Sequence, residues 1–210
     1  ELAEMLKEVG EHFGVRTDLV YSNMDQPLGR FSGMWCEVKE AINCLSGEGP
    51  EDTMAVCFKL ASKLMIQSGK AKDETESDSI LNKLIENGSA YEKFEVMTAA
   101  QGGDLNEAEY SPSYTLDIVA ETSGIIQSMN TTEIGWGLVE MGCGRKRKDD
   151  ILDPSAGLEC HHKIGDEIQA GEKLFTCFCN NKEKLKKGVE KISNTVCISS
   201  EKVELSLFYN

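Results

Sequence analysis

The sequence lacks an apolar run of the roughly 18 to 20 residues that a membrane-spanning helix needs, and it lacks a basic-then-apolar leader at its start. Basic residues are also scarce, because 22 lysines and arginines stand against 36 acidic residues and leave a formal net charge of −14. Such a field repels nucleic-acid phosphates and anionic lipid surfaces. We therefore expect no nucleic-acid or membrane partner, and we predict a soluble, cytoplasmic protein.

The sequence also has no Cys-x-x-Cys pair, and its eight cysteines follow no framework spacing. A chain of 210 residues with 40% hydrophobic composition can bury a core without disulfides. The cysteines are therefore predicted to be reduced thiols, mostly buried as small apolar groups. The alternative is metal capture at the surface by Cys177 and Cys179.

Common catalytic motifs are missing as well. There is no HExxH, GxSxG or P-loop, and no glycine pair follows a strand with the spacing of a dinucleotide-binding fold. Histidine is limited to His12, in an opening helix, and to the adjacent His161 and His162. Neighbours in a strand point to opposite faces, so these two cannot share a metal ion. Each histidine is predicted to be structural or exposed.

The first hundred residues show mainly helical periodicity. An apolar i, i+3, i+4 pattern predicts a helix over residues 1–13, and because no capping residue precedes it we expect further chain upstream. Further helices are predicted at 33–45, 52–67, 73–86 and 90–100. The run 15–21 predicts one strand. A helix that leads into a strand is typical of an α/β sheet.

Beyond residue 105 the pattern changes to short β-type runs separated by glycine turns. Strands are predicted at 115–121, 124–129, 158–162, 173–179 and 203–208, and helices at 132–141 and 182–192. The change predicts two domains, residues 1–105 and residues 106–210. The predicted fold class is α/β plus α+β, in which the C-terminal part of a mixed α/β sheet domain is followed by a β-rich subdomain.

The β-rich subdomain contains a stretch typical of a biotinyl or lipoyl carrier half. From Lys163 to Phe175, short strands are joined by a Gly-Asp turn and an Ala-Gly turn. In a carrier, the next hairpin presents a lysine between two methionines. Here residues 176–180 read Thr-Cys-Phe-Cys-Asn, so no lysine is available for modification. The stretch predicts a barrel-sandwich scaffold without carrier chemistry.

Two charged segments are candidates for binding. The basic run from Arg145 to Lys148 follows a glycine-rich turn and could bind an anion. We instead predict a solvated loop that the repulsion among its charges keeps extended. The turn Pro27–Gly29 is followed by a helix that opens with Glu37 and Glu40. Loop carbonyls beside a carboxylate suit a hard cation with oxygen ligands, although acidic residues in a first helical turn are also ordinary.

Four motifs follow one another in the sequence: Met-x-Gln-Pro-Leu-Gly at 24–29, Gly-x-x-x-Glu-Val-x-Glu-Ala at 33–41, Leu-x-Gly-x-Gly-Pro at 45–50 and Gln-Gly-Gly-Asp at 101–104. In order and spacing they resemble motifs of the pyrimidine-nucleoside phosphorylase and thymidine phosphorylase family. A Gly-Cys-Gly-Arg and a Lys-Ile-Gly-Asp segment continue the resemblance into the C-terminal part.

The resemblance implies a glycosyltransferase that cleaves pyrimidine nucleosides such as uridine or thymidine with inorganic phosphate, giving the free base and a pentose 1-phosphate. The family binds phosphate with a Lys-x-Ser-Thr-Gly-Gly loop and the base with Arg, Ser and Lys side chains, and none of these has a counterpart here. We therefore expect the catalytic residues upstream of Glu1 and an inactive isolated chain. The helices that form the family's homodimer are expected upstream too.

The resemblance also implies a cation site for K⁺ or Ca²⁺. The backbone carbonyls of Leu28 and Phe31 and the carboxylate of Glu40 would supply this chain's share of the ligands, and the other ligands are expected upstream of Glu1. Alanine is usual at the Phe31 position, but a carbonyl ligand survives that replacement. No organic cofactor is expected, and inorganic phosphate is the co-substrate. Two alternatives stay open. One is a nucleoside-monophosphate phosphorylase of the same superfamily, and the other is a non-enzymatic scaffold that retains only the carrier-like module.

Overall fold

The computed structural model describes residues 1–105 and 110–209, which form seven α-helices and nine short strands. The helices are α1 (Leu2–His12), α2 (Trp35–Leu45), α3 (Glu51–Gln67), α4 (Glu74–Glu86), α5 (Ser89–Ala100), α6 (Thr131–Met141) and α7 (Lys182–Ile192). The strands are β1 (Tyr21–Ser22), β2 (Phe31–Gly33), β3 (Tyr114–Val119), β4 (Gly124–Met129), β5 (Gly157–Cys160), β6 (Glu167–Ile168), β7 (Lys173–Cys179), β8 (Val196–Ser199) and β9 (Phe208–Tyr209).

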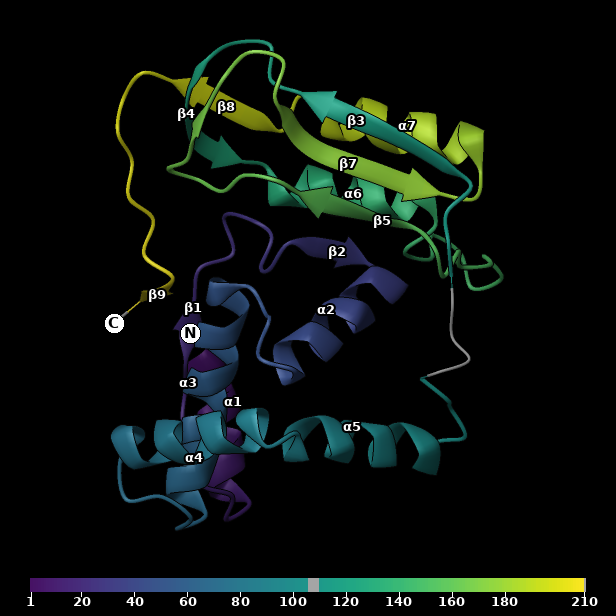
Figure 1. Ribbon diagram of the computed structural model, residues 1–210. Coiled ribbons are helices and arrows are strands. Elements are labelled where there is room, and N and C mark those ends of the chain that lie inside the picture. The colour runs from purple at the N-terminus through teal and green to yellow at the C-terminus, as the bar shows by residue number, and fades with distance from the viewer. Residues whose placement is uncertain (106–109, 210) are drawn as a thin grey trace.

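The molecule has a helical half and a sheet-rich half. Figure 1 shows α1, α3, α4 and α5 in the lower part, the larger sheets with α6 and α7 in the upper part, and α2 and β2 between them. The described strands all pair antiparallel, in the orders β2-β5-β7-β3, β6-β4-β8 and β1-β9. Strand pairing therefore connects the halves twice, through β2 with β5 and through β1 with β9.

Local sequence explains much of the helical half. Helix α2 buries the stripe Cys36, Glu40 and Cys44, whose spacing of four places them on one face. The Asp73 side chain accepts a hydrogen bond from the Glu76 amide and caps the start of α4. In contrast, α1 and α5 contain no fully buried residue.

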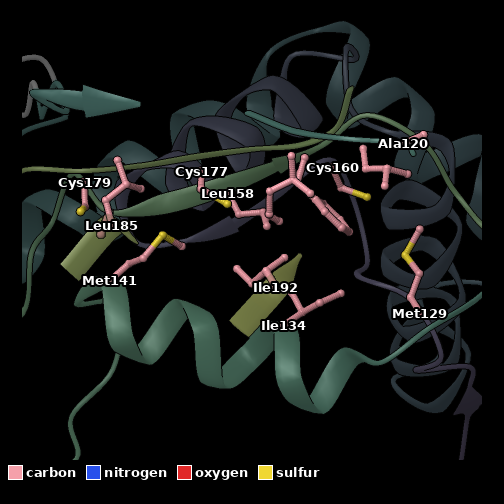
Figure 2. Packing of buried hydrophobic residues seen from close by; sticks show 14 of the residues in the cluster. Ala120, Met129, Ile134, Met141, Leu158, Cys160, Cys177, Cys179, Leu185 and Ile192 are labelled. Carbon is pink, nitrogen blue, oxygen red and sulfur yellow. The ribbon is translucent and has the colours of Figure 1, made fainter. Parts of the chain in front are cut away.

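The main hydrophobic core lies in the sheet-rich half. Its buried cluster contains residues from Ile118 to Ile192 among those described (Figure 2). In β7, Phe175, Cys177 and Cys179 are completely buried at every second position, as expected for a strand with one face on the core. The interpretation that Cys177 and Cys179 capture metal at the surface is therefore wrong.

Helices α6 and α7 pack closely beneath this sheet because glycines lie at their contact. A Cβ atom on Gly137 would overlap the Ile192 side chain, and one on Gly188 would overlap Met141. The absence of side chains at these two positions lets the helices approach and bury their apolar faces.

The structure confirms a mixed α/β protein and the predicted helices, but it corrects two strands. The strand predicted at 15–21 is wrong, because only Tyr21 enters a ladder and residues 15–20 pair with no strand. The strand predicted at 203–208 is wrong except at Phe208, the first residue of β9. The sequence patterns also missed β2 and β8, which exist through pairing with β5 and β4.

The division into residues 1–105 and 106–210 stays a prediction, since residues 106–109 lie outside the described part of the chain. The expected α/β sheet of the first part is not formed by its own described strands, because β1 and β2 pair only with β9 and β5. The carrier-like scaffold likewise stays an interpretation. Across the described helices, none is both long and apolar enough to cross a lipid bilayer.

Candidate functional site

The loop from Gln26 to Arg30, which leads into β2, is attached to the sheet-rich half. The Cys160 amide donates to the Arg30 carbonyl at 2.7 Å, and the Ile164 amide donates to Gln26 Oε1 at 2.8 Å. The Arg30 guanidinium also pairs with Glu159 at 2.8 Å. These contacts hold the loop against the end of β5.

Glu40 of α2 reaches the same loop with a buried carboxylate. Its Oε1 accepts hydrogen bonds from the amides of Arg30 at 2.8 Å and Phe31 at 3.2 Å, and the residue is 8% exposed. Burial raises the pKa of Glu40, as does the nearby charge of Asp52, whereas the two amide donors and the charge of Lys163 oppose the rise. The charge of this carboxylate is therefore only partly compensated by its neighbours.

Gly29 gives the carboxylate its space. Its φ of +71° is in the left-handed region that favours glycine. A Cβ atom at this position would overlap Glu40 Oε2 and would also crowd Thr53 Oγ1. The loop therefore needs glycine here both for its conformation and for the room beside Glu40.

The register of β2 decides where the Phe31 carbonyl points. Phe31 lies opposite Glu159, and the adjacent Arg30 carbonyl accepts from Cys160, so Phe31 is in a pair without ladder hydrogen bonds. Its N–H and C=O consequently face away from β5. The N–H meets Glu40, and the carbonyl leaves the outer edge of the sheet on that same side.

The predicted ligands Leu28, Phe31 and Glu40 thus belong to one loop and the helix that contacts it. The Leu28 carbonyl accepts no hydrogen bond from the described residues. Among those residues, His, Cys, Asp and Glu side chains form no group of three that could hold a metal. A cation here would depend on carbonyl oxygens, and its binding stays a prediction.

Lys163 is a central residue of this region that the sequence patterns placed in a motif but did not nominate as a site residue. Its ammonium donates to the carbonyls of Pro27 and Gly29, each at 2.5 Å, and to Asp52 Oδ2 at 2.9 Å. Burial opposes ionisation of Asp52, but Lys163 and the amides of Thr53 and Gly29 together outweigh it and lower the pKa of Asp52. No local signal could reveal this contact, because the acceptors lie 111 to 136 residues away in sequence.

Two hollows border the loop. The larger, of about 730 Å³, is lined by Leu28 and Lys163 together with the start of α3 and part of the C-terminal segment. The smaller, of about 390 Å³, is lined by Phe31 and Glu40 together with several aromatic side chains. The candidate cation ligands therefore lie between two hollows that are large enough to admit small molecules or another chain segment.

The adjacent histidines contact different partners. His161 Nε2 lies 2.8 Å from Thr176 Oγ1, whose hydroxyl donates to Asp117 at 2.7 Å. His162 Nδ1 lies 3.9 Å from Asp166. Burial lowers the pKa of His161. His161 also lines the larger hollow together with the Gln26–Arg30 loop, and a purely structural role for either histidine stays a prediction.

The basic run is not extended as predicted. The Lys146 and Arg147 amides both donate to Asp150 Oδ2 at 2.9 Å, and Arg145 Nε donates to the Asp150 carbonyl at 3.2 Å. Lys146 also pairs with Glu140. Hydrogen bonds to one aspartate close the loop in spite of the repulsion among its cations.

Comparison with known proteins identifies relatives of this chain. Residues 125–199 match the family described as the pyrimidine nucleoside phosphorylase C-terminal domain. The pyrimidine-nucleoside phosphorylase of Staphylococcus haemolyticus is 33% identical over 213 residues, which cover 99% of this chain and 49% of that protein. The Bacillus subtilis enzyme of the same name is 34% identical over 207 residues, covering 96% and 47%. That of Geobacillus stearothermophilus is 33% identical over 209 residues, covering 97% and 48%.

The chain thus spans about half the length of the curated relatives it matches. The similarity runs through the Glu40 loop as well as through the sheet-rich half that holds it. On these grounds the chain belongs to the pyrimidine-nucleoside phosphorylase family.

Proposed function

We propose that this chain is part of a pyrimidine-nucleoside phosphorylase, a glycosyltransferase that acts on nucleosides such as uridine or thymidine. Such an enzyme transfers the pentose from the base to inorganic phosphate and releases the free base and a pentose 1-phosphate. The observation that carries the proposal is the similarity to relatives of that name along 99% of the chain, which includes the loop and helix around Glu40.

We further propose that K⁺ or Ca²⁺ binds to the carbonyls of Leu28 and Phe31 and to the Glu40 carboxylate. Hard cations take oxygen ligands, and the three groups offer them. The buried charge of Glu40, the outward Phe31 carbonyl, and the room that Gly29 leaves beside Oε2 all fit such an ion. A bound cation would neutralise Glu40 and steady the loop at the edge of the larger hollow.

The chain's own contribution to the reaction is proposed to be a wall of the substrate cleft. Phosphorolysis needs groups that hold phosphate against the anomeric carbon and groups that stabilise charge on the leaving base. In the larger hollow the Lys163 ammonium already has three oxygen acceptors within the chain, so its N–H groups are engaged. We propose that the phosphate-binding and base-binding groups lie outside residues 1–210.

The test is a uridine phosphorolysis assay with two preparations. One is the chain alone, and the other is the chain mixed with the half of the Bacillus subtilis relative that it does not match. We expect uracil release only from the mixture. Release by the chain alone at a rate near that of the intact relative would contradict the inactivity of the chain. No release from a mixture in which the halves bind one another would contradict the proposed reaction.

A further inference from the structure

We infer that Lys163 is a positioning residue for the proposed cation site: its ammonium holds the loop in the conformation that leaves the Leu28 carbonyl free for the cation. The inference rests on the proposed function, since it concerns the same site. Lys163 does not contact the candidate ligands themselves and would act through the residues on either side of Leu28.

The contacts of Lys163 are specific to this loop. The carbonyls of Pro27 and Gly29, the two residues that flank Leu28, both converge on the ammonium at 2.5 Å. Of the three consecutive carbonyls, only that of Leu28 lacks a donor among the described residues. The ammonium therefore selects which carbonyl of the turn stays available.

Asp52 completes the arrangement from a third segment. Its Oδ2 accepts from Lys163 at 2.9 Å and from the Gly29 amide at 3.1 Å. The Lys163 and Asp52 side chains are 27% and 20% exposed, so the pair is largely removed from solvent. Gly29 is consequently held at both its N–H and its C=O, beside the Glu40 carboxylate that its missing Cβ accommodates.

The charges also favour this role for Lys163. Two carboxylates, Glu40 and Asp52, approach the loop, and the Lys163 ammonium pairs directly with Asp52. Without the ammonium, the carbonyls of Pro27 and Gly29 would lose their donor and Asp52 would keep only its amide donors, which is costly in a partly buried site. The loop would then rearrange, and the carbonyl that faces the proposed cation would move with it.

A competing view is that the ammonium is itself the cation of this region and replaces an inorganic ion. The two views predict opposite results when the charge is removed. If Lys163 positions the loop, its loss weakens cation binding. If Lys163 substitutes for the ion, its loss leaves cation binding unchanged or strengthens it.

The experiment uses the chain labelled with ¹³C at leucine and phenylalanine carbonyls and mixed with the half of the Bacillus subtilis relative that it does not match. The mixture is titrated with KCl and separately with CaCl₂ at constant ionic strength. The readout is the Leu28 carbonyl chemical shift in the folded population, which a purely stabilising role of Lys163 would not alter. For the unchanged chain we expect a saturable shift. Glu40→Gln should abolish it, and Lys163→Met should weaken the cation affinity by about 10-fold to 100-fold, as for other groups that orient metal ligands.

The matched control is Lys173→Met, which removes another lysine of the sheet-rich half that pairs with an aspartate at 2.9 Å. It should leave the cation affinity unchanged. If Lys163→Met does not fold, Lys163→Arg serves instead, because a planar guanidinium keeps the charge but cannot meet the three oxygens as an ammonium does. We then expect a weaker affinity, and an affinity equal to that of the unchanged chain overturns the inference.

The outcomes distinguish the existence of the cation site from the role of Lys163 in it. No saturable shift with either salt in the unchanged chain contradicts the proposed cation site itself. A shift that is lost in Glu40→Gln but fully retained in Lys163→Met leaves the cation site in place and refutes the role of Lys163.

Discussion

The two halves of the molecule bury their apolar residues to very different extents. In the sheet-rich half, Leu158 and Phe175 are completely buried between the four-stranded sheet and its two helices. In the helical half, Leu2 and Leu6 of α1 are 70% and 60% exposed, although the helix is clearly amphipathic. Apolar periodicity therefore predicts which element forms but not how completely its apolar face is covered.

The largest expected effect contrasts two leucines. Leu158→Ala should lower the free energy of unfolding by about 2 to 5 kcal/mol, because it leaves a cavity in a closed core. Leu64→Ala, at a position that is 66% exposed, should cost less than about 0.5 kcal/mol. Urea unfolding followed by tryptophan fluorescence measures both. Equal losses would show that α3 is covered in solution as fully as the sheet.

Thiol reactivity sharpens the same comparison. Burial raises the pKa of Cys177 to about 12, whereas Cys57 of α3 is exposed. Because the thiolate is the reactive form, alkylation at pH 8 should be at least about a hundredfold faster at Cys57. Peptide mass spectrometry follows each site, and the two rates should converge in guanidinium. Rapid labelling of Cys177 in the folded chain would mean that the core opens readily.

Substitutions at two glycines with nearly the same φ can show how tightly the loop packs around Glu40. Gly14 and Gly29 have φ of +72° and +71°, but a Cβ atom on Gly14 would meet nothing within 4 Å. Gly14→Ala should therefore lower the free energy of unfolding by only about 1 kcal/mol, because alanine is strained in the left-handed backbone conformation. Gly29→Ala should lower the free energy of unfolding by at least about 2 kcal/mol, because the methyl group also displaces Glu40. Similar thermal unfolding losses would show that Glu40 moves aside without penalty.

The smallest effect concerns an exposed carboxylate of the sheet. Hydrogen bonds from Lys173 and Thr176 lower the pKa of Asp117. A lowered folded pKa gives stability that is present above the unfolded pKa of about 4 and is lost as the pH falls through the folded value. Asp117→Asn should thus lower the free energy of unfolding by less than about 1 kcal/mol at pH 6, after solvent screening, and by progressively less as the pH falls.

The corresponding control in the helical half is Glu74→Gln, which removes an exposed carboxylate paired with Lys59 at 2.8 Å. The Lys59 hydrogen bond and charge lower the pKa of Glu74. Glu74→Gln should therefore also lower the free energy of unfolding, and its effect should diminish as the pH falls, as for Asp117→Asn. Unfolding curves at pH 2, 4 and 6 check both variants. A loss that does not diminish from pH 6 to pH 2 would point to packing instead of charge.

Most helices could be predicted because their signals are local. The spacing that predicts a helix at 132–141 needs only neighbouring residues, and α6 is observed at Thr131–Met141. The short strands could not be predicted in this way. Phe31 enters β2 by lying opposite Glu159, and Tyr21 enters β1 by lying opposite Tyr209, so each strand depends on a partner that is more than a hundred residues away.

The amino-acid order alone was enough to predict the helices, to indicate the family through its motifs, and to nominate Leu28, Phe31 and Glu40 as ligands of a cation. Their binding of an ion stays a prediction. Only the folded chain shows Lys163 meeting Pro27, Gly29 and Asp52 at one point. The reason is physical: an ammonium bonds to whatever acceptors packing brings within about 3 Å, and no local preference of the chain encodes that approach.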